Sequence, residues 1–109
     1  MAAIDFEIGR FFSEMASMRM DLEAYKEWCR TYESFNYPKW TMRDGNQIAL
    51  CDMTDSHLDN AIALVGRKEP NNGWIDIFKQ EKKYRSLKDK IATIQLDLSK
   101  MEEIRDKVF

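Results

Sequence analysis

The chain has 109 residues and a mass of 12.9 kDa, with 44% hydrophobic and 33% charged residues. That length corresponds to one domain, and four glycines and two prolines are too few for an all-β sandwich, which turns about every 8–12 residues. A net charge of −2 provides no overall attraction to nucleic acid or anionic lipid. No run approaches the roughly 18 apolar residues of a membrane span, and the acidic start lacks the basic flank of a signal peptide. We therefore expect one soluble, cytoplasmic, mainly helical domain over residues 1–109.

The first helix is predicted from about residue 4 to residue 34, because its apolar residues recur at alternating steps of four and three. This seam consists of Ile4, Ile8, Phe11, Met15, Met18, Leu22, Tyr25, Cys29 and Tyr32. Phe12, Trp28 and Phe35 make the apolar stripe wider than a two-stranded coiled coil needs, so the helix is expected to serve a globular core as well. It should end near residues 35–38, because the residue before a proline is pushed out of helical geometry.

Residues 39–50 predict a β-hairpin around Gly45. A three-residue loop over 43–45, with Gly45 in the left-handed conformation of a bulge, pairs Trp40 with Ile48 and keeps the apolar side chains on one face. A two-residue loop would divide them between the two faces. Two strands alone are marginally stable in water, so the hairpin is expected to pack against a helix.

A short helix is predicted after Thr54, whose side chain can cap it, with Asp55 adding a favourable charge in the first turn. Its core-facing residues are Leu58, Ile62 and Val65. Gly66 is expected to end this helix in left-handed geometry. The hairpin and the short helix together form a central insert at about 39–66.

A last helix is predicted over 74–108, a stretch with neither Gly nor Pro. At 1.5 Å per residue it is on the order of 50 Å long, and the first helix on the order of 45 Å. Part of each seam would project from a globule of this size, so we expect self-association, most simply as a two-fold dimer. The expected interface residues are Ile8, Phe11, Met15, Met18, Leu22, Tyr84, Leu87, Ile91, Ile94, Leu98 and Met101. Pairing of the two long helices within one chain or between chains remains open.

The predicted fold class is therefore mainly α, in the order helix, strand, strand, helix, helix. Two long heptad-patterned helices flank a hairpin and a short helix.

The cysteines and the single histidine give no strong chemical motif. Cys29 and Cys51 match neither a disulfide framework nor a zinc spacing, and both are expected to be buried thiols. A nucleophilic or metal-binding pair of Cys51 and His57 is an alternative, but a thiolate needs a base held against it and zinc takes four ligands. We expect His57 to hydrogen-bond near the helix cap. No catalytic residue, cofactor or metal is predicted.

The basic residues of the chain are concentrated in 67–90, which holds eight Lys or Arg against four Asp or Glu. The candidate ligand-binding residues are Lys79, Lys82, Lys83, Arg85 and Lys90. Such a face can hold the phosphates of a nucleotide or nucleic acid. The alternative is the solvated side of a paired helix, with Glu81 and Arg85 as an i,i+4 ion pair. No aromatic stacking platform accompanies the lysines.

Two neighbouring stretches form a distinctive block. They read Trp40-Thr41-x-Arg43-Asp44-Gly45-x-x-Ile48 and Asp52-Met53-x-x-x-His57-Leu58-x-Asn60-Ala61-Ile62. The block resembles one in small uncharacterised proteins of phages and prophages, and the resemblance implies a phage origin. Small phage proteins without catalytic residues commonly occupy a host protein's surface or sequester a small signal.

From these observations we expect a non-enzymatic, self-associating interaction protein in the host cytoplasm. It would bind and block, or adapt, a host protein, for instance as an inhibitor of host defence. One alternative is an oligomeric protein that sequesters an anionic nucleotide, and another is a nucleic-acid-binding protein. No membrane partner is expected.

Overall fold

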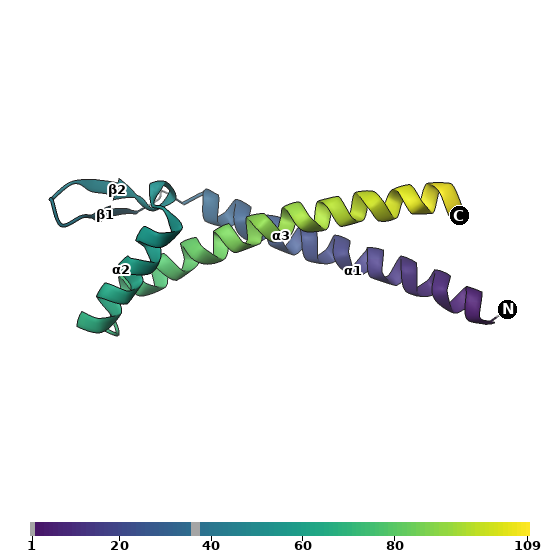
Figure 1. Ribbon diagram of the computed structural model, residues 1–109, viewed down its shortest axis with the longest axis horizontal. Helices are drawn as coiled ribbons and strands as arrows, with labels where there is room; N and C mark the ends of the chain where they lie inside the picture. Colours follow the sequence, from purple (N-terminus) through teal and green to yellow (C-terminus); the bar gives the residue numbers. More distant parts are fainter. Residues whose placement is uncertain (1, 36–37) are drawn as a thin grey trace. The chain divides into compact units, whose positions relative to one another are not determined.

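The computed structural model describes residues 2–35 and 38–109, with the backbone alone for 2–7. The elements in chain order are α1 (Ala2–Glu33), β1 (Lys39–Thr41), β2 (Gln47–Ala49), a 3-10 turn (Leu50–Asp52), α2 (Asp55–Lys68) and α3 (Gly73–Val108) (Figure 1). This is the mainly α fold that the sequence predicts, in the predicted order. Among the described residues, no helix combines the length and the apolar character that crossing a bilayer requires.

The chain divides into two compact units. Unit 1 comprises Met1–Arg30 and Leu87–Phe109, and unit 2 comprises Thr31–Ser86. Each long helix therefore contributes residues to both units. The expected single domain stays a prediction, and the two units are described separately below.

Unit 1 is an antiparallel pair formed by α1 and the second part of α3, with both chain ends at the same end of the pair (Figure 1). Its buried core consists of Met15, Leu22 and Leu98. Half-buried seam residues pack around it: Phe11, Met18, Ile91, Ile94 and Met101. The two seams thus face each other within one chain, which the sequence left open. The side chain of Ile4, the first predicted seam residue, lies outside the described part.

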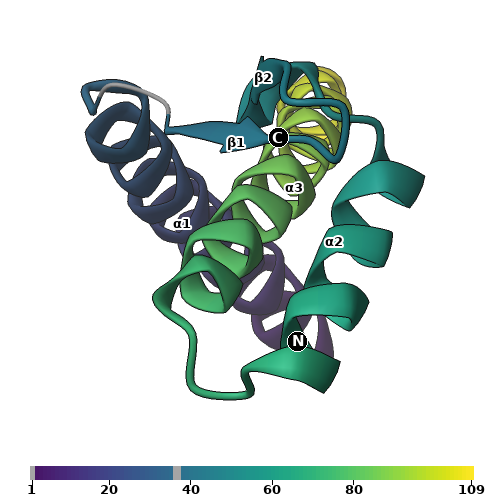
Figure 2. The same cartoon turned by 90° about the vertical axis from the view of Figure 1, so that its left-hand side faces the viewer.

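Unit 2 has its own apolar core, in which α2 lies beside the first turns of α3 (Figure 2). The buried members are Leu50, Met53, Leu58, Ala61, Val65 and Phe78. The hairpin packs on this core through Trp40, whose ring centroid lies 5.2 Å from that of Trp74 and 5.1 Å from that of Phe78. As expected, the two short strands do not stand alone but rest on helices.

The hairpin has the predicted register. Trp40 pairs with Ile48, and the loop is closed by the Met42 N–H donating to the Asn46 carbonyl at 2.8 Å. Gly45 has a φ of +86°, the left-handed conformation that residues with a Cβ rarely adopt. The three-residue loop with a glycine bulge is therefore confirmed.

The two ends of α2 illustrate one correct and one wrong prediction. Thr54 caps the start, since its Oγ1 accepts the His57 N–H at 3.1 Å. The prediction that Gly66 ends the helix is wrong: α2 continues to Lys68, and Gly66 lacks a positive φ. The last helical residue is Lys68 and Glu69 is the C-cap, because Pro70 disfavours helical geometry in the residue before it.

The other long-helix boundaries lie close to their predicted positions. The helix α1 ends at Glu33, and the predicted stop region includes Asn36 and Tyr37, which are outside the described residues. The helix α3 begins at Gly73, where the Oδ1 of Asn72 accepts the Trp74 N–H at 2.8 Å and caps the first turn.

Candidate functional site

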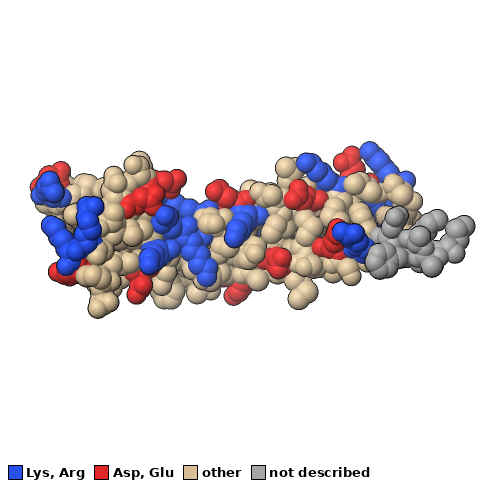
Figure 3. Space-filling view, turned by 60° about the horizontal axis from the view of Figure 1, so that its bottom comes forward, with Lys and Arg blue, Asp and Glu red and all other residues tan. Residues whose placement is uncertain are grey.

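The predicted basic face is divided between the two units. Lys79, Lys82 and Lys83 are exposed on the part of α3 in unit 2, while Lys90 lies in unit 1 with its Nζ 6.0 Å from the Tyr25 ring centre. The Nζ of Lys82 pairs with Asp59 of α2 at 2.6 Å. Figure 3 shows basic side chains interspersed with acidic ones, so the face it displays is not continuously positive.

The side chain of Arg85 is engaged in hydrogen bonds within unit 2. Its guanidinium donates to Asp55 Oδ1 at 2.7 Å, to Glu81 Oε1 at 3.1 Å, and to the carbonyls of Leu50 and Met53 at 3.0 and 2.6 Å. Burial disfavours the charged guanidinium, but hydrogen bonds to Asp55 and Glu81 more than compensate and raise the pKa of Arg85. Four of its five donors are thus used to join α3, α2 and the 3-10 turn.

Glu81 forms the predicted pair with Arg85 but does not lie on a solvated side. It is 1% exposed, and its second oxygen accepts the Tyr32 hydroxyl at 2.5 Å. The prediction of a solvated Glu81 is therefore wrong, because Tyr32 and Arg85 satisfy the carboxylate inside the unit. Tyr84, predicted as an interface residue, stacks on Tyr32 with ring centroids 4.9 Å apart.

The predicted interface residues of unit 1 mostly cover one another across the helix pair. Several large apolar side chains outside that contact remain exposed: Phe12, Met20, Leu96, Ile104, Val108 and Phe109. Phe109 lies against both Phe11 and Phe12, with ring centroids 5.4 and 5.7 Å apart. The free end of unit 1 is consequently an exposed aromatic and aliphatic surface.

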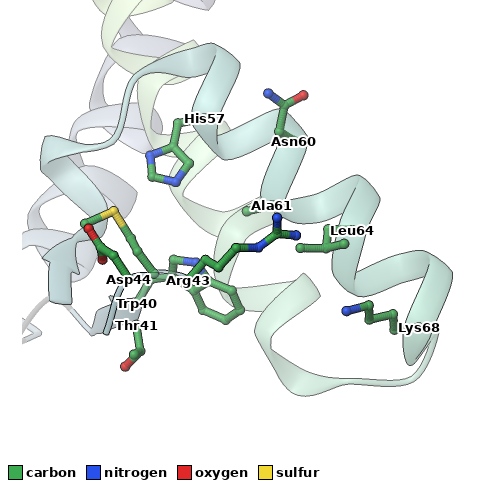
Figure 4. Close-up of a pocket in the computed structure, with 10 residues that line it drawn as sticks. Trp40, Thr41, Arg43, Asp44, His57, Asn60, Ala61, Leu64 and Lys68 are labelled. Atoms are coloured by element: carbon green, nitrogen blue, oxygen red, sulfur yellow. The ribbon is translucent and has the colours of Figure 1, made fainter. Parts of the chain in front are cut away.

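A groove between the hairpin and α2, with a volume of about 590 Å³, is the candidate site of unit 2 (Figure 4). Its lining consists of residues 40–44 from β1 and its loop, and of His57, Asn60, Ala61, Leu64 and Lys68 from α2. The α2 residues recur at steps of three and four, so they form one stripe along the helix. We call this site the hairpin–α2 groove.

The hairpin–α2 groove combines an apolar floor with cations at its rim. Arg43 extends from the hairpin toward α2, and Lys68 projects from the last turn of α2 (Figure 4). Within residues 2–35 and 38–109, neither cation has an ion pair. The one lining carboxylate, Asp44, is held in the loop, where its two oxygens accept from the backbone and side chain of Asn46 at 3.0 and 3.1 Å.

A second hollow of about 270 Å³ shares Trp40, Leu64 and Lys68 with the groove. It continues toward the end of α2, where Glu69 accepts from Asn72 at 2.7 Å. The two hollows therefore form adjoining parts of one concave surface around Trp40.

Sequence reasoning missed this groove, although a signal for it was present. Seven of the ten lining residues belong to the sequence block described above. They are Trp40, Thr41, Arg43, Asp44, His57, Asn60 and Ala61. Other members of the block build the support, since Gly45 makes the turn and Met53 and Leu58 are buried in the core. The block thus encodes a surface together with the platform that holds it.

The remaining chemical candidates are placed as follows. Cys29 is buried as expected, whereas the prediction of a buried Cys51 is wrong: it is exposed on the 3-10 turn, because Leu50 and Met53 are the residues that turn into the core. The Cys51 Sγ lies 3.9 Å from Asp52 Oδ1, and His57 lines the groove. In the part of the chain that the structure describes, no group of three or more His, Cys, Asp and Glu is placed to hold a metal ion.

No family model matches this chain, and no curated protein or solved structure resembles it significantly.

Proposed function

We propose that this chain is a non-enzymatic interaction protein of phage origin that binds a host protein and thereby blocks or adapts it. The observation that carries the proposal is the hairpin–α2 groove, with its apolar floor and two rim cations that have no ion pair among the described residues. The groove is more open than enclosed, whereas sites for small molecules enclose most of the ligand's surface. An open, partly apolar groove is typical of protein recognition.

A nucleotide or nucleic-acid function of the basic segment has weaker support. Arg85 already binds two carboxylates and two carbonyls, and Lys82 pairs with Asp59. An added phosphate would have to displace these internal partners. In the hairpin–α2 groove, by contrast, Arg43 and Lys68 have no ion-pair partner among the described residues.

Self-association is a second part of the proposal and concerns unit 1. Two packed helices cover only one face of each other, and unit 1 buries only a few large side chains in its core. A second copy would cover the exposed apolar residues and complete a four-helix arrangement. The dimer would present two grooves to a partner.

Affinity capture from a bacterial lysate tests the binding function. The double variant Arg43→Glu/Lys68→Glu reverses the rim charge, and Lys79→Glu/Lys83→Glu makes the same charge change on exposed residues of α3 as a matched control. We expect one host protein to be retained by the wild type and the control and lost with the groove variant. Equal capture by all three proteins would refute the assignment of binding to the groove.

Sedimentation equilibrium at micromolar concentration tests self-association. We expect a mass of twice 12.9 kDa for the wild type, and a monomer for Leu96→Asp/Ile104→Asp, whose side chains are 57% and 47% exposed within one chain. Gln95→Asp, which adds a charge at an exposed position of the same helix, is the control. A monomeric wild type would remove this part of the proposal.

A further inference from the structure

The first strand has an open backbone edge. The Leu50 N–H donates to the Pro38 carbonyl at 3.4 Å, and the Met42 N–H donates to the Asn46 carbonyl at 2.8 Å. These two bonds flank β1 on either side of the Trp40–Ile48 pair, so the backbone groups of Trp40 also point at β2. Backbone groups alternate in direction along a strand. Those of Thr41 therefore point away from β2, and among the described residues the sheet has no further strand on that side.

The hairpin–α2 groove follows this edge. On one face of a strand only alternate residues can line a groove, because side chains alternate between the faces. Here the adjacent strand residues Trp40 and Thr41 both line it, followed by residues 42–44 beyond the strand. The groove therefore passes along the side of β1 and its loop, with the α2 stripe as its opposite wall.

The length and chemistry of the groove indicate what it can hold. From His57 to Lys68 the α2 wall extends on the order of 16 Å, the length of about five residues of extended chain. In an added strand, alternate side chains would face the apolar floor at Trp40 and Leu64. Acidic side chains near the rim would meet Arg43 and Lys68, which have no carboxylate partner in the described residues.

We infer that the hairpin–α2 groove binds an extended segment of its partner protein as an added strand on the open edge of β1, and that this segment alternates acidic and apolar residues. The inference rests on the proposed function and specifies its ligand. Backbone hydrogen bonds to Thr41 supply the register, and the cations and the apolar floor select the sequence.

The test uses the full chain and a synthetic peptide, capped at both ends and about seven residues long, that alternates Asp and Leu. Binding is followed by NMR as shifts of the Trp40 indole and as slowed hydrogen exchange of the Thr41 amide. We expect saturable shifts confined to the groove, and weakening by about tenfold or more in Arg43→Glu/Lys68→Glu. A Lys–Leu peptide of equal length is the charge control.

A proline substitution tests the strand addition itself. Thr41→Pro removes the N–H on the open edge of β1 and leaves the bonds to β2 in place, since edge positions tolerate proline. Gln47→Pro removes the outward N–H of the paired residue on the opposite edge and is the matched control. We expect Thr41→Pro, but not Gln47→Pro, to abolish peptide binding, with far-UV circular dichroism confirming that both variants fold. A peptide N-methylated at alternate residues should lose binding in the same way.

Several results would overturn the inference. Strand addition would be excluded if the peptide bound Thr41→Pro as well as it binds the wild type, or if the N-methylated peptide bound the wild type undiminished. A peptide ligand would be excluded if adenosine monophosphate shifted the groove resonances and the peptide did not. These failures are distinguishable from failure of the proposed function. If host-protein capture still depends on Arg43 and Lys68 while the peptide tests fail, the groove binds a partner in another geometry.

Discussion

Replacing Arg85 by methionine should destabilise unit 2 strongly, because Arg85 supports a buried carboxylate. The side chain of Arg85 is 24% exposed and that of Glu81 is 2% exposed, so their 3.1 Å contact is largely shielded from water. Arg85→Met would leave Glu81 with only the Tyr32 hydroxyl, and would leave the Leu50 and Met53 carbonyls without this donor. A buried charge that loses its partner costs about 3–5 kcal/mol.

Partial access of water to Arg85 reduces that figure, so we expect a loss of about 2–4 kcal/mol in the free energy of unfolding. For a chain of this size it corresponds to a fall in Tm of roughly 10–20 °C. The contact with Asp55 should contribute under about 1 kcal/mol, because that carboxylate is 87% exposed. Asp55→Asn is therefore expected to be mild although its contact with Arg85 is the shorter of the two.

Urea unfolding followed by tryptophan fluorescence measures these differences, since Trp40 and Trp74 both lie in unit 2. Lys79→Met is the control for exchanging an exposed cation for methionine. The double variant Arg85→Met/Glu81→Met should recover part of the loss, because it no longer leaves a buried charge unpaired. A loss below about 1 kcal/mol for Arg85→Met, or an equal loss for Asp55→Asn, would refute the reasoning from burial.

Other substitutions test local features of the two units by the same unfolding measurement. Gly45→Ala should lower the free energy of unfolding by about 1 kcal/mol, because an alanine is strained at a φ of +86°. Gly66→Ala, in the interior of α2, should raise the free energy of unfolding by about 0.5–1 kcal/mol. A change of the same sign for both variants would contradict this assignment. Thr54→Ala should cost about 1 kcal/mol through loss of the bond to the His57 N–H, and Thr54→Ser should restore most of it. Leu98→Ala should cost about 2–5 kcal/mol and weaken self-association, since Leu98 is 6% exposed in the core of unit 1; a change under about 1 kcal/mol would show that this core is not closely packed.

Local sequence signals were sufficient for most of the fold. The steps of three and four between apolar residues predict both long helices, and the parity of apolar positions around Gly45 predicts the hairpin register. The cap at Thr54 follows in the same way. Each signal acts over a few residues, so it is readable without knowing what the segment packs against. The error at Gly66 shows the limit, because two local signals competed and Pro70 decided the helix end.

Only the tertiary structure decided which surfaces exist. Burial of Glu81 is possible because the hydroxyl of Tyr32, 49 residues away, donates a hydrogen bond to it. The sequence around Glu81 does not predict that contact. The groove likewise requires residues 40–44 and the α2 stripe to lie opposite each other, which the packing of Trp40 on Trp74 and Phe78 establishes. A helix or strand pattern states which face is apolar, but the free energy of burial depends on what covers that face, and this is a property of the folded chain.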